Sequence, residues 1–268
     1  KNSSSVLVHQ LISTRPDFAA YLVETAFDQT DALLAANLGT ALFFYFQTDA
    51  EAAREAARRL FDSGNPPFQM AVGHALSNPP VEDGRLAPAD FDLLIRVLGS
   101  SDKRVVVSAS RVFFRLAEVS TRLALDMLRY VNFHSDAGLI DSIFMVFHGG
   151  RDDVFNAMTT ADVDFLLGKL RDVPELDGHW VETLLSHLSR FYPDPPLRFF
   201  LERVELAAEQ DQFNRLRPIN YGPWTHVRLR FREADRFHVL LDRVWDWVVG
   251  LDSQNWRYTH NAAALSEA

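Results

Sequence analysis

A ten-residue segment occurs twice in the chain, and this repeat limits the fold more than any other feature of the sequence. The first copy starts at Ala89 and reads ADFDLLIRVL, and the second starts at Ala161 and reads ADVDFLLGKL. Five of the ten positions are identical, and three more are apolar in both copies. The interval between the two starts has room for two helical hairpins of about 36 residues each. Such a hairpin cannot bury its own apolar face, so neighbouring hairpins must stack.

Apolar residues recur with helical period along most of the chain. Residues 103–118 are the clearest example, because one face carries Val105, Ala109, Val112, Phe113 and Leu116. Clusters of Pro and Gly separate such stripes, and residues 1–212 show no convincing alternation of period two. The sequence predicts helices over 17–27, 30–47, 49–62, 67–77, 88–99, 103–118, 121–132, 136–148, 160–171, 179–192, 196–209 and 233–250.

Local signals support the starts of several of these helices. Thr48 and Glu51 have the spacing of a capping box, which predicts that a helix starts there. Glu51 and Arg54 are spaced to pair on one face of the same helix. Pro88 suits the first position of the helix predicted over 88–99.

One of the apolar stripes resembles a known repeat family. The segment SDKRVVVSASRVFFRL, residues 101–116, resembles the second helix of a HEAT hairpin, in which a turn Asp precedes Val, then Ala, then two large apolar residues and Leu. Residues 177–188 form a looser copy. The Arg that commonly follows the Val is replaced by Val107 and Glu182. The resemblance covers roughly residues 49–209, and it implies an all-α superhelix of HEAT-like hairpins and a binding role without chemistry.

The charge divides the chain into two regions. Residues 1–212 carry a net charge of −11, and we interpret them as the helical-repeat array. Residues 213–268 carry +2, and we interpret them as a continuation that starts with an irregular insert near 213–232 and is truncated at its C-terminal end. The run HVRLRFR at 226–232 alternates strictly and predicts a short strand in this insert. The non-Met start and the apparent new helix at 262–268 lead us to expect a piece of a longer protein.

The insert is also the one region that suggests a binding site. Residues 214–232 contain five Arg and no acidic residue, and four of the five Trp of the chain lie beyond residue 212. Arginines beside aromatic rings bind phosphate, nucleic acid or acidic protein segments. The candidate binding residues are Arg215, Arg217, Trp224, Arg228, Arg230 and Arg232. The alternative is structural, with these arginines covering the acidic edge of neighbouring hairpins.

Sequence signals for catalysis are weak. The chain has no Cys, and therefore neither a thiolate nucleophile nor a Cys-ligated metal. It has no phosphate-binding loop, dinucleotide fingerprint, nucleophile elbow or HExxH motif. Two pairs of carboxylates fall in the first turns of predicted helices: Asp90 and Asp92 in 88–99, and Asp162 and Asp164 in 160–171. Thr160 is the expected cap of the helix 160–171. His179, Glu182 and His187 share one predicted helix, but His187 lies about two turns from His179, too far for one compact metal site. We expect His179 and Glu182 to be exposed. We therefore predict no catalytic residue, no metal and no cofactor.

We interpret the chain as a non-catalytic protein-binding or sensor region, or scaffold, of a larger bacterial regulatory or defence protein in the cytoplasm. Its expected partner is a protein or another domain of the same polypeptide. No segment reaches the roughly 20 apolar residues of a membrane span, so we expect no membrane partner. Two alternatives stay open: a helical array that binds nucleic acid or another anion through the 214–232 arginines, and an enzyme with Asp90 or His179 in a cleft.

Overall fold

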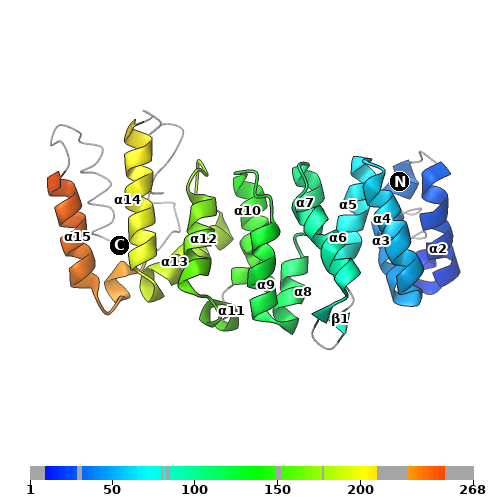
Figure 1. The fold of residues 1–268 in the computed structure, drawn as a ribbon, viewed down its shortest axis with the longest axis horizontal. Helices are drawn as coiled ribbons and strands as arrows, with labels where there is room; N and C mark the ends of the chain where they lie inside the picture. The colour runs from blue at the N-terminus through cyan, green and yellow to red at the C-terminus, as the bar shows by residue number, and fades with distance from the viewer. Residues whose placement is uncertain are drawn as a thin grey trace. The chain divides into compact units, whose positions relative to one another are not determined.

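The computed structural model describes residues 10–28, 32–79, 81–82, 85–148, 152–176, 178–209 and 229–250, and these residues form an all-α fold (Figure 1). Contacts divide the chain into two compact units, Lys1–His134 (unit 1) and Ser135–Ala268 (unit 2). This division lies away from the predicted boundary at 212/213, whose surroundings are outside the described residues. The described residues contain no helix that is both long and apolar enough to cross a membrane.

Unit 1 is a succession of helices with one short hairpin. Its elements are α2 (Pro16–Thr25), η1 (Ala26–Asp28), α3 (Ala32–Thr48), α4 (Ala50–Asp62), α5 (Pro66–Leu76), β1 (Val81–Glu82), β2 (Arg85–Leu86), α6 (Pro88–Leu98), α7 (Lys103–Ala109), α8 (Val112–Val119), α9 (Thr121–Met127) and η2 (Leu128–Tyr130). Pro occupies the first turn of α2, α5 and α6, where its missing N–H costs nothing. Asp49, Asp102 and Ser120 cap α4, α7 and α9 with side-chain oxygens.

Helices α3, α5 and α7 pack one against the next through small residues. A Cβ on Gly39 of α3 would meet His74 of α5 at 2.9 Å and the Ala71 carbonyl at 3.2 Å. A Cβ on Gly73 of α5 would meet Ser108 of α7 at 2.0 Å and the Val105 carbonyl at 3.1 Å. The separation in sequence between the glycine and each contacted residue is the same in both helix pairs. The same close contact therefore recurs in the next pair of helices along the chain.

The buried residues of unit 1 recur at the same interval in the sequence as the glycine contacts. Buried residues fall at equivalent positions of the three helices: Leu38 and Ala41 of α3, Val72 and Ala75 of α5, and Val106 and Ala109 of α7. The step from one pair to the next is identical along the chain. The five apolar residues that define the predicted helix 103–118 are buried as well. That helix is nonetheless divided into α7 and α8, because the Ser110 N–H bonds to the Val107 carbonyl three residues back and tightens the turn.

Unit 2 contains the second series of helices. Its elements are α10 (Ala137–Phe144), η3 (Met145–Phe147), α11 (Asp152–Asn156), α12 (Thr160–Leu170), α13 (His179–Phe191), α14 (Asp194–Glu209), η4 (Phe231–Glu233) and α15 (Phe237–Gly250). Helix α10 packs on α13, and α14 packs on both α12 and α13. Asp141 of α10 accepts hydrogen bonds from the backbone N–H groups of Trp180 and Val181 at 2.7 and 3.3 Å. It thereby caps α13, whose own N-cap residue is the glycine Gly178.

Several sequence predictions need correction. The predicted strand at 226–232 is wrong over its described part, because residues 229 and 230 are irregular and residues 231–233 form the 3₁₀ helix η4. The five-residue helix α11 and the hairpin of β1 and β2, with Val81 opposite Leu86, have no counterpart among the predicted elements. Both are too short to show a periodic pattern. The remaining predicted helices are confirmed within a few residues at each end.

Candidate functional site

Of the six predicted binding residues, the structure describes Arg230 and Arg232; Arg215, Arg217, Trp224 and Arg228 lie outside the described residues. Two guanidinium nitrogens of Arg230 donate to the carboxylate of Glu233. The Arg230 backbone N–H donates to Ser189 Oγ of α13 at 2.7 Å, and Arg190 of α13 pairs with Glu233 at 3.4 Å. This part of the insert is thus fastened to α13, while the Arg230 guanidinium pairs with Glu233 of its own turn and not with a described acidic residue of a neighbouring helix. Arg232 is exposed.

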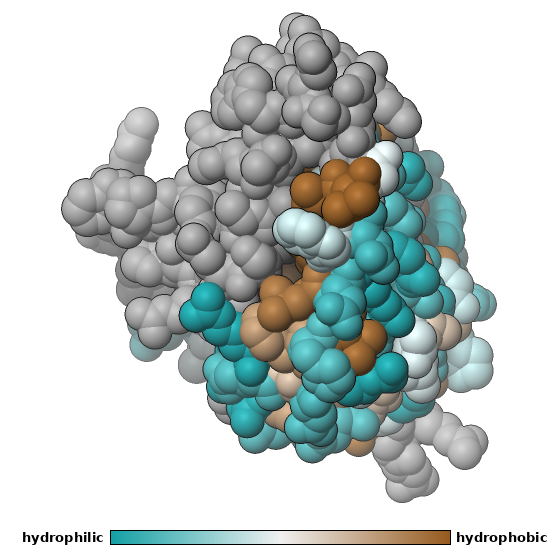
Figure 2. All heavy atoms as spheres, turned by 90° about the vertical axis from the view of Figure 1, so that its left-hand side faces the viewer, coloured by the Kyte–Doolittle hydropathy of each residue, from teal (hydrophilic) through white to brown (hydrophobic). Residues whose placement is uncertain are grey.

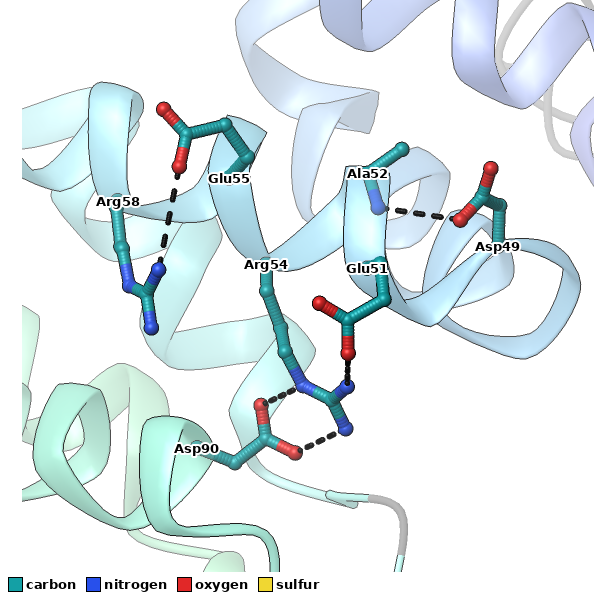
Figure 3. A network of polar contacts seen from close by, with 7 residues as sticks. All are labelled: Asp49, Glu51, Ala52, Arg54, Glu55, Arg58 and Asp90. Atoms are coloured by element: carbon teal, nitrogen blue, oxygen red, sulfur yellow. Dashed lines mark hydrogen bonds and ion pairs between the residues drawn. The ribbon is translucent and has the colours of Figure 1, made fainter.

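Asp90 belongs to a buried ion pair in unit 1. Its carboxylate is 1% exposed and accepts from Arg54 Nε and Nη2 at 2.9 and 3.0 Å. Figure 3 shows the Arg54 side chain reaching from α4 to Asp90 on α6, with Glu51 on a third guanidinium nitrogen at 2.7 Å. The hydrogen bonds to Asp90 are the largest cause of the raised pKa of Arg54. A buried carboxylate with both oxygens engaged in this way is poorly placed to meet a substrate, which disfavours the enzyme alternative at Asp90.

Asp162 takes the equivalent position in the second copy of the repeat and also lies in a first helical turn. It accepts from the N–H and hydroxyl of Thr159 at 2.9 and 2.7 Å, and the Thr159 hydroxyl accepts from the Asp162 N–H. The cap is therefore Thr159, one residue before the predicted Thr160. Asp164 faces outward and pairs with Arg198 of α14 at 2.9 Å.

The His179, Glu182 and His187 side chains do not form a metal site. Among the described residues, no three potential metal ligands come together. His179 is exposed as expected, whereas Glu182 is buried, contrary to the prediction. The His187 ring lies flat on Phe155, with centroids 3.7 Å apart, and tilts against Phe191 at 4.5 Å. Burial lowers the pKa of His187 to about 4, with Arg230 and Arg190 acting in the same direction and Asp152 against it.

Two hollows, in contrast, flank α14 on the surface of unit 2. The first, which we call the α12–α14 hollow, has a volume of about 230 Å³ and is lined by Asp164, Leu167, Gly168, Arg171, Pro195, Arg198, Phe199 and Glu202. The second, the α14–α15 hollow, is also about 230 Å³ and is lined by Asp194, Leu197, Arg198, Leu201, Glu202, Glu205, Arg243 and Trp247. Arg198 and Glu202 line both, so these two side chains form the ridge between the hollows.

Ion pairs border both hollows. Arg198 lies between Asp164 at 2.9 Å and Glu202 at 4.0 Å, and Arg243 of α15 pairs with Asp194 of α14. The indole N–H of Trp247 donates to Glu205 at 2.7 Å. Buried Leu167, Leu197 and Phe199 form the apolar floor. Shallow hollows with an apolar floor and a charged border are suited to side chains of a macromolecular partner, because small-molecule pockets enclose about 300–1,000 Å³.

A buried arginine supports this surface from below. The Arg203 side chain of α14 is 0% exposed, and its Nη1 donates to the carbonyls of Leu170, Arg171 and Val173 at 2.9, 2.7 and 2.9 Å. These carbonyls lie at the end of α12 and in the turn that follows it, where the Leu170 carbonyl also accepts from the Val173 N–H at 3.2 Å. Burial lowers the pKa of Arg203 to about 10, and Asp172 opposes this. Arg203 thus fixes the distance and orientation between α12 and α14.

The sequence reasoning missed this site because its residues come from three helices that are separated in the chain. A signal was nonetheless present, since Asp164 and Arg198 lie 34 residues apart, close to the expected hairpin length. Comparison with family models, with curated proteins and with solved structures found no match. The functional proposal therefore rests on the residues of this chain.

Proposed function

We propose that the chain is a non-catalytic protein-binding array of stacked, HEAT-like helical hairpins. The observation that carries the binding role is the pair of small hollows on either side of α14, with their apolar floor and charged border. These hollows are the size of side chains, and charged residues around an apolar centre are typical of surfaces that recognise proteins. The enzyme alternative has less support, because Asp90 is engaged by Arg54 and the three potential metal ligands of α13 are not assembled among the described residues.

The spacing of contacts supports the stacked hairpins. Arg59 pairs with Glu24, Arg96 with Asp62 and Arg198 with Asp164, over separations of 35, 34 and 34 residues. Arg59 also lies over Phe27 and Arg96 over Phe61, at separations of 32 and 35 residues. The three ion pairs, together with the glycine contacts of α3, α5 and α7, support a similar period in both units, close to half of the interval between the two sequence copies.

Exposed apolar side chains favour a partner on unit 2. Trp245 and Val249 lie one turn apart on α15 and are 68% and 65% exposed. Figure 2 faces the end of unit 2 at which α15 lies, and it shows apolar patches among hydrophilic side chains. Exposed Trp is rare on a free surface and common in protein interfaces. Of the two described arginines of the 214–232 cluster, Arg230 is engaged by Glu233, which makes it less available to nucleic acid.

An affinity experiment tests the proposal. The full chain is immobilised and exposed to a lysate of the organism that encodes it, beside a variant with Arg198→Glu and Trp245→Ser. Both replaced side chains are exposed, so we expect the variant to fold. A retained protein should be lost with the variant and should then bind the purified chain directly in calorimetry. Equal retention by wild type and variant, or no retention by either, would contradict the proposed role of this surface.

A further inference from the structure

We propose that the α12–α14 hollow binds one acidic side chain of an extended partner peptide, with Arg171 as the cation that holds its carboxylate. This inference rests on the proposed protein-binding function and assigns it a site and a ligand class. It follows from four features of the hollow: its available arginine, its glycine, its volume and its position beside the second hollow.

Arg171 is the cation of this hollow that is available to a ligand. Arg198 is held between Asp164 and Glu202, and Arg203 is directed at the end of α12. The exposed guanidinium of Arg171, in contrast, has no hydrogen bond or ion pair to any described residue. Asp172 follows it in the chain, but its charge acts on Arg203. A guanidinium binds a carboxylate through two parallel N–H donors, a geometry that an ammonium lacks.

Gly168 keeps the hollow open. It lies inside α12, three residues before Arg171, and a Cβ added there would meet no atom within 4 Å. Unlike Gly39 and Gly73, it is required neither by a close helix contact nor by a positive φ. A glycine inside a helix is less favourable than Ala. A position that is unfavourable for the helix and leaves empty space beside an apolar floor is best explained by a ligand side chain that occupies that space.

The hollow is too small for a metabolite and suits a single side chain. Its volume of about 230 Å³ lies below the range of about 300–1,000 Å³ for small-molecule pockets. The floor of Leu167 and Phe199 fits the aliphatic stem of Glu or Asp, while Arg171 meets the carboxylate. Asp164 is paired with Arg198 at 2.9 Å, which reduces its repulsion of an incoming carboxylate, while Glu202 lies 4.0 Å from the same guanidinium on the ridge.

The α14–α15 hollow adds a second anchor. It lies across the Arg198–Glu202 ridge and is lined by Leu197, Leu201 and Trp247, which suits an apolar side chain. Adjacent helices are about 8–10 Å apart, and an extended chain advances about 3.3 Å per residue. A peptide that crosses α14 should therefore place its acidic and apolar anchors about three residues apart.

Selection of random linear peptides displayed on phage tests this inference directly. The full chain is the bait, and we expect enriched peptides with Glu or Asp about three residues from a large apolar residue. Arg171→Glu should reverse the preference from acidic to basic and weaken the selected peptides by about tenfold or more. Gly168→Leu should also abolish binding, because its Cβ meets no atom within 4 Å and the rest of the side chain extends into the space of the hollow.

Two matched variants separate the site from general effects. Arg232→Glu makes the same charge change at an exposed arginine of the predicted cluster, and Gly138→Leu makes the same exchange at an exposed helix position of α10. Both should bind like wild type, and thermal unfolding should show that all four variants are folded. Loss of acidic peptides with Arg232→Glu instead of Arg171→Glu would overturn the inference.

The remaining outcomes distinguish this inference from the proposed function. Enriched peptides without an acidic residue, or binding that ignores Arg171→Glu and Gly168→Leu, would overturn the acidic-side-chain site and leave the protein-binding role standing. A selection that enriches nothing would overturn the site too. If the lysate experiment also showed no retention, or equal retention by wild type and variant, the protein-binding role would be contradicted as well.

Discussion

Arg54 of α4 and Asp90 of α6 lie 36 residues apart in the chain and form a two-point ion pair that is almost closed to solvent. The Arg54 side chain is 14% exposed and the Asp90 carboxylate 1%. Surface ion pairs such as Arg58–Glu55, at 3.9 Å and with both side chains largely exposed, contribute little because water screens them. A buried carboxylate that loses its partner, in contrast, keeps the full cost of desolvation.

We therefore expect Arg54→Ala to lower the free energy of unfolding by about 3–5 kcal/mol. Arg58→Ala, on the same helix, should change it by less than about 1 kcal/mol. The double variant Arg54→Met with Asp90→Leu removes both charges and should recover most of the loss. Urea titrations of the four proteins, followed by circular dichroism, measure these differences. Equal losses for Arg54→Ala and Arg58→Ala would show that Asp90 does not depend on its partner.

Replacement by Ala should change stability in opposite directions at Gly39 of unit 1 and Gly168 of unit 2. At Gly39, the new Cβ would lie 2.9 Å from the His74 ring and 3.2 Å from the Ala71 carbonyl, so α3 and α5 must move apart. We expect a loss of about 1–3 kcal/mol. At Gly168, the new Cβ meets nothing, and better helix propensity should add up to about 1 kcal/mol. Thermal unfolding of the two variants checks the sign, and stabilisation by Gly39→Ala would contradict the close contact between α3 and α5.

The sequence predicts contacts between residues that are close in the chain, and it does not predict contacts between residues that are far apart in it. Helix starts at Pro66 and Pro88 were predicted within a residue, because Pro fixes the local backbone. The pairing of Glu51 with Arg54 was visible from its spacing of three residues, but Asp90, the more buried partner, lies 36 residues away on another helix. No local pattern contains such a contact.

The helix caps show the same limit at a finer scale. Thr48 and Thr160 were predicted to start helices, whereas Asp49 and Thr159 are the caps. Both positions carry residue types that favour caps, and the backbone angles that decide between neighbours are set by tertiary packing. The binding site was missed for this reason too, because its side chains come together only when α12, α14 and α15 pack.

Arg203 should be essential for the packing of α12 on α14. Arg203→Met keeps the apolar stem but removes this donor from the carbonyls of Leu170, Arg171 and Val173, of which Leu170 keeps the Val173 N–H and Val173 is left in a buried place. Buried acceptors without partners cost about 1–3 kcal/mol, so we expect a loss of at least about 2 kcal/mol in urea titrations. Arg122→Met, which removes an exposed pair with Asp126 in unit 1, is the matched control and should cost less than about 1 kcal/mol.

Arg203→Met should also have a local effect, on hydrogen exchange at the end of α12. Hydrogen exchange of the last turn of α12 should accelerate in Arg203→Met, because the residue holds that turn. Unchanged exchange in this turn, despite a folded protein, would mean that the three carbonyls are stabilised in another way.

Unit 2 should lose stability as the pH falls from about 6.5 to about 4. The half-buried His187 is stacked between Phe155 and Phe191, and burial lowers its pKa to about 4. In this pH window the unfolded chain binds a proton at His187 that the folded chain does not, so the contribution of His187 to stability decreases with decreasing pH and is constant below about pH 4. One pKa unit corresponds to about 1.4 kcal/mol. Because solvent screens a half-buried ring, we expect His187 to account for a loss of about 1–2 kcal/mol.

The variant His187→Phe isolates this contribution, since it keeps a flat ring against Phe155 and cannot titrate. Urea titrations at pH 7 and pH 4.5 should show a smaller decrease for His187→Phe than for wild type. The exposed His179→Gln on the same helix should retain the wild-type decrease. Burial and Arg111 also lower the pKa of His74 in unit 1, so part of the decrease should persist in His187→Phe. A decrease that is identical in wild type and His187→Phe would show that the ring protonates as easily in the folded as in the unfolded chain.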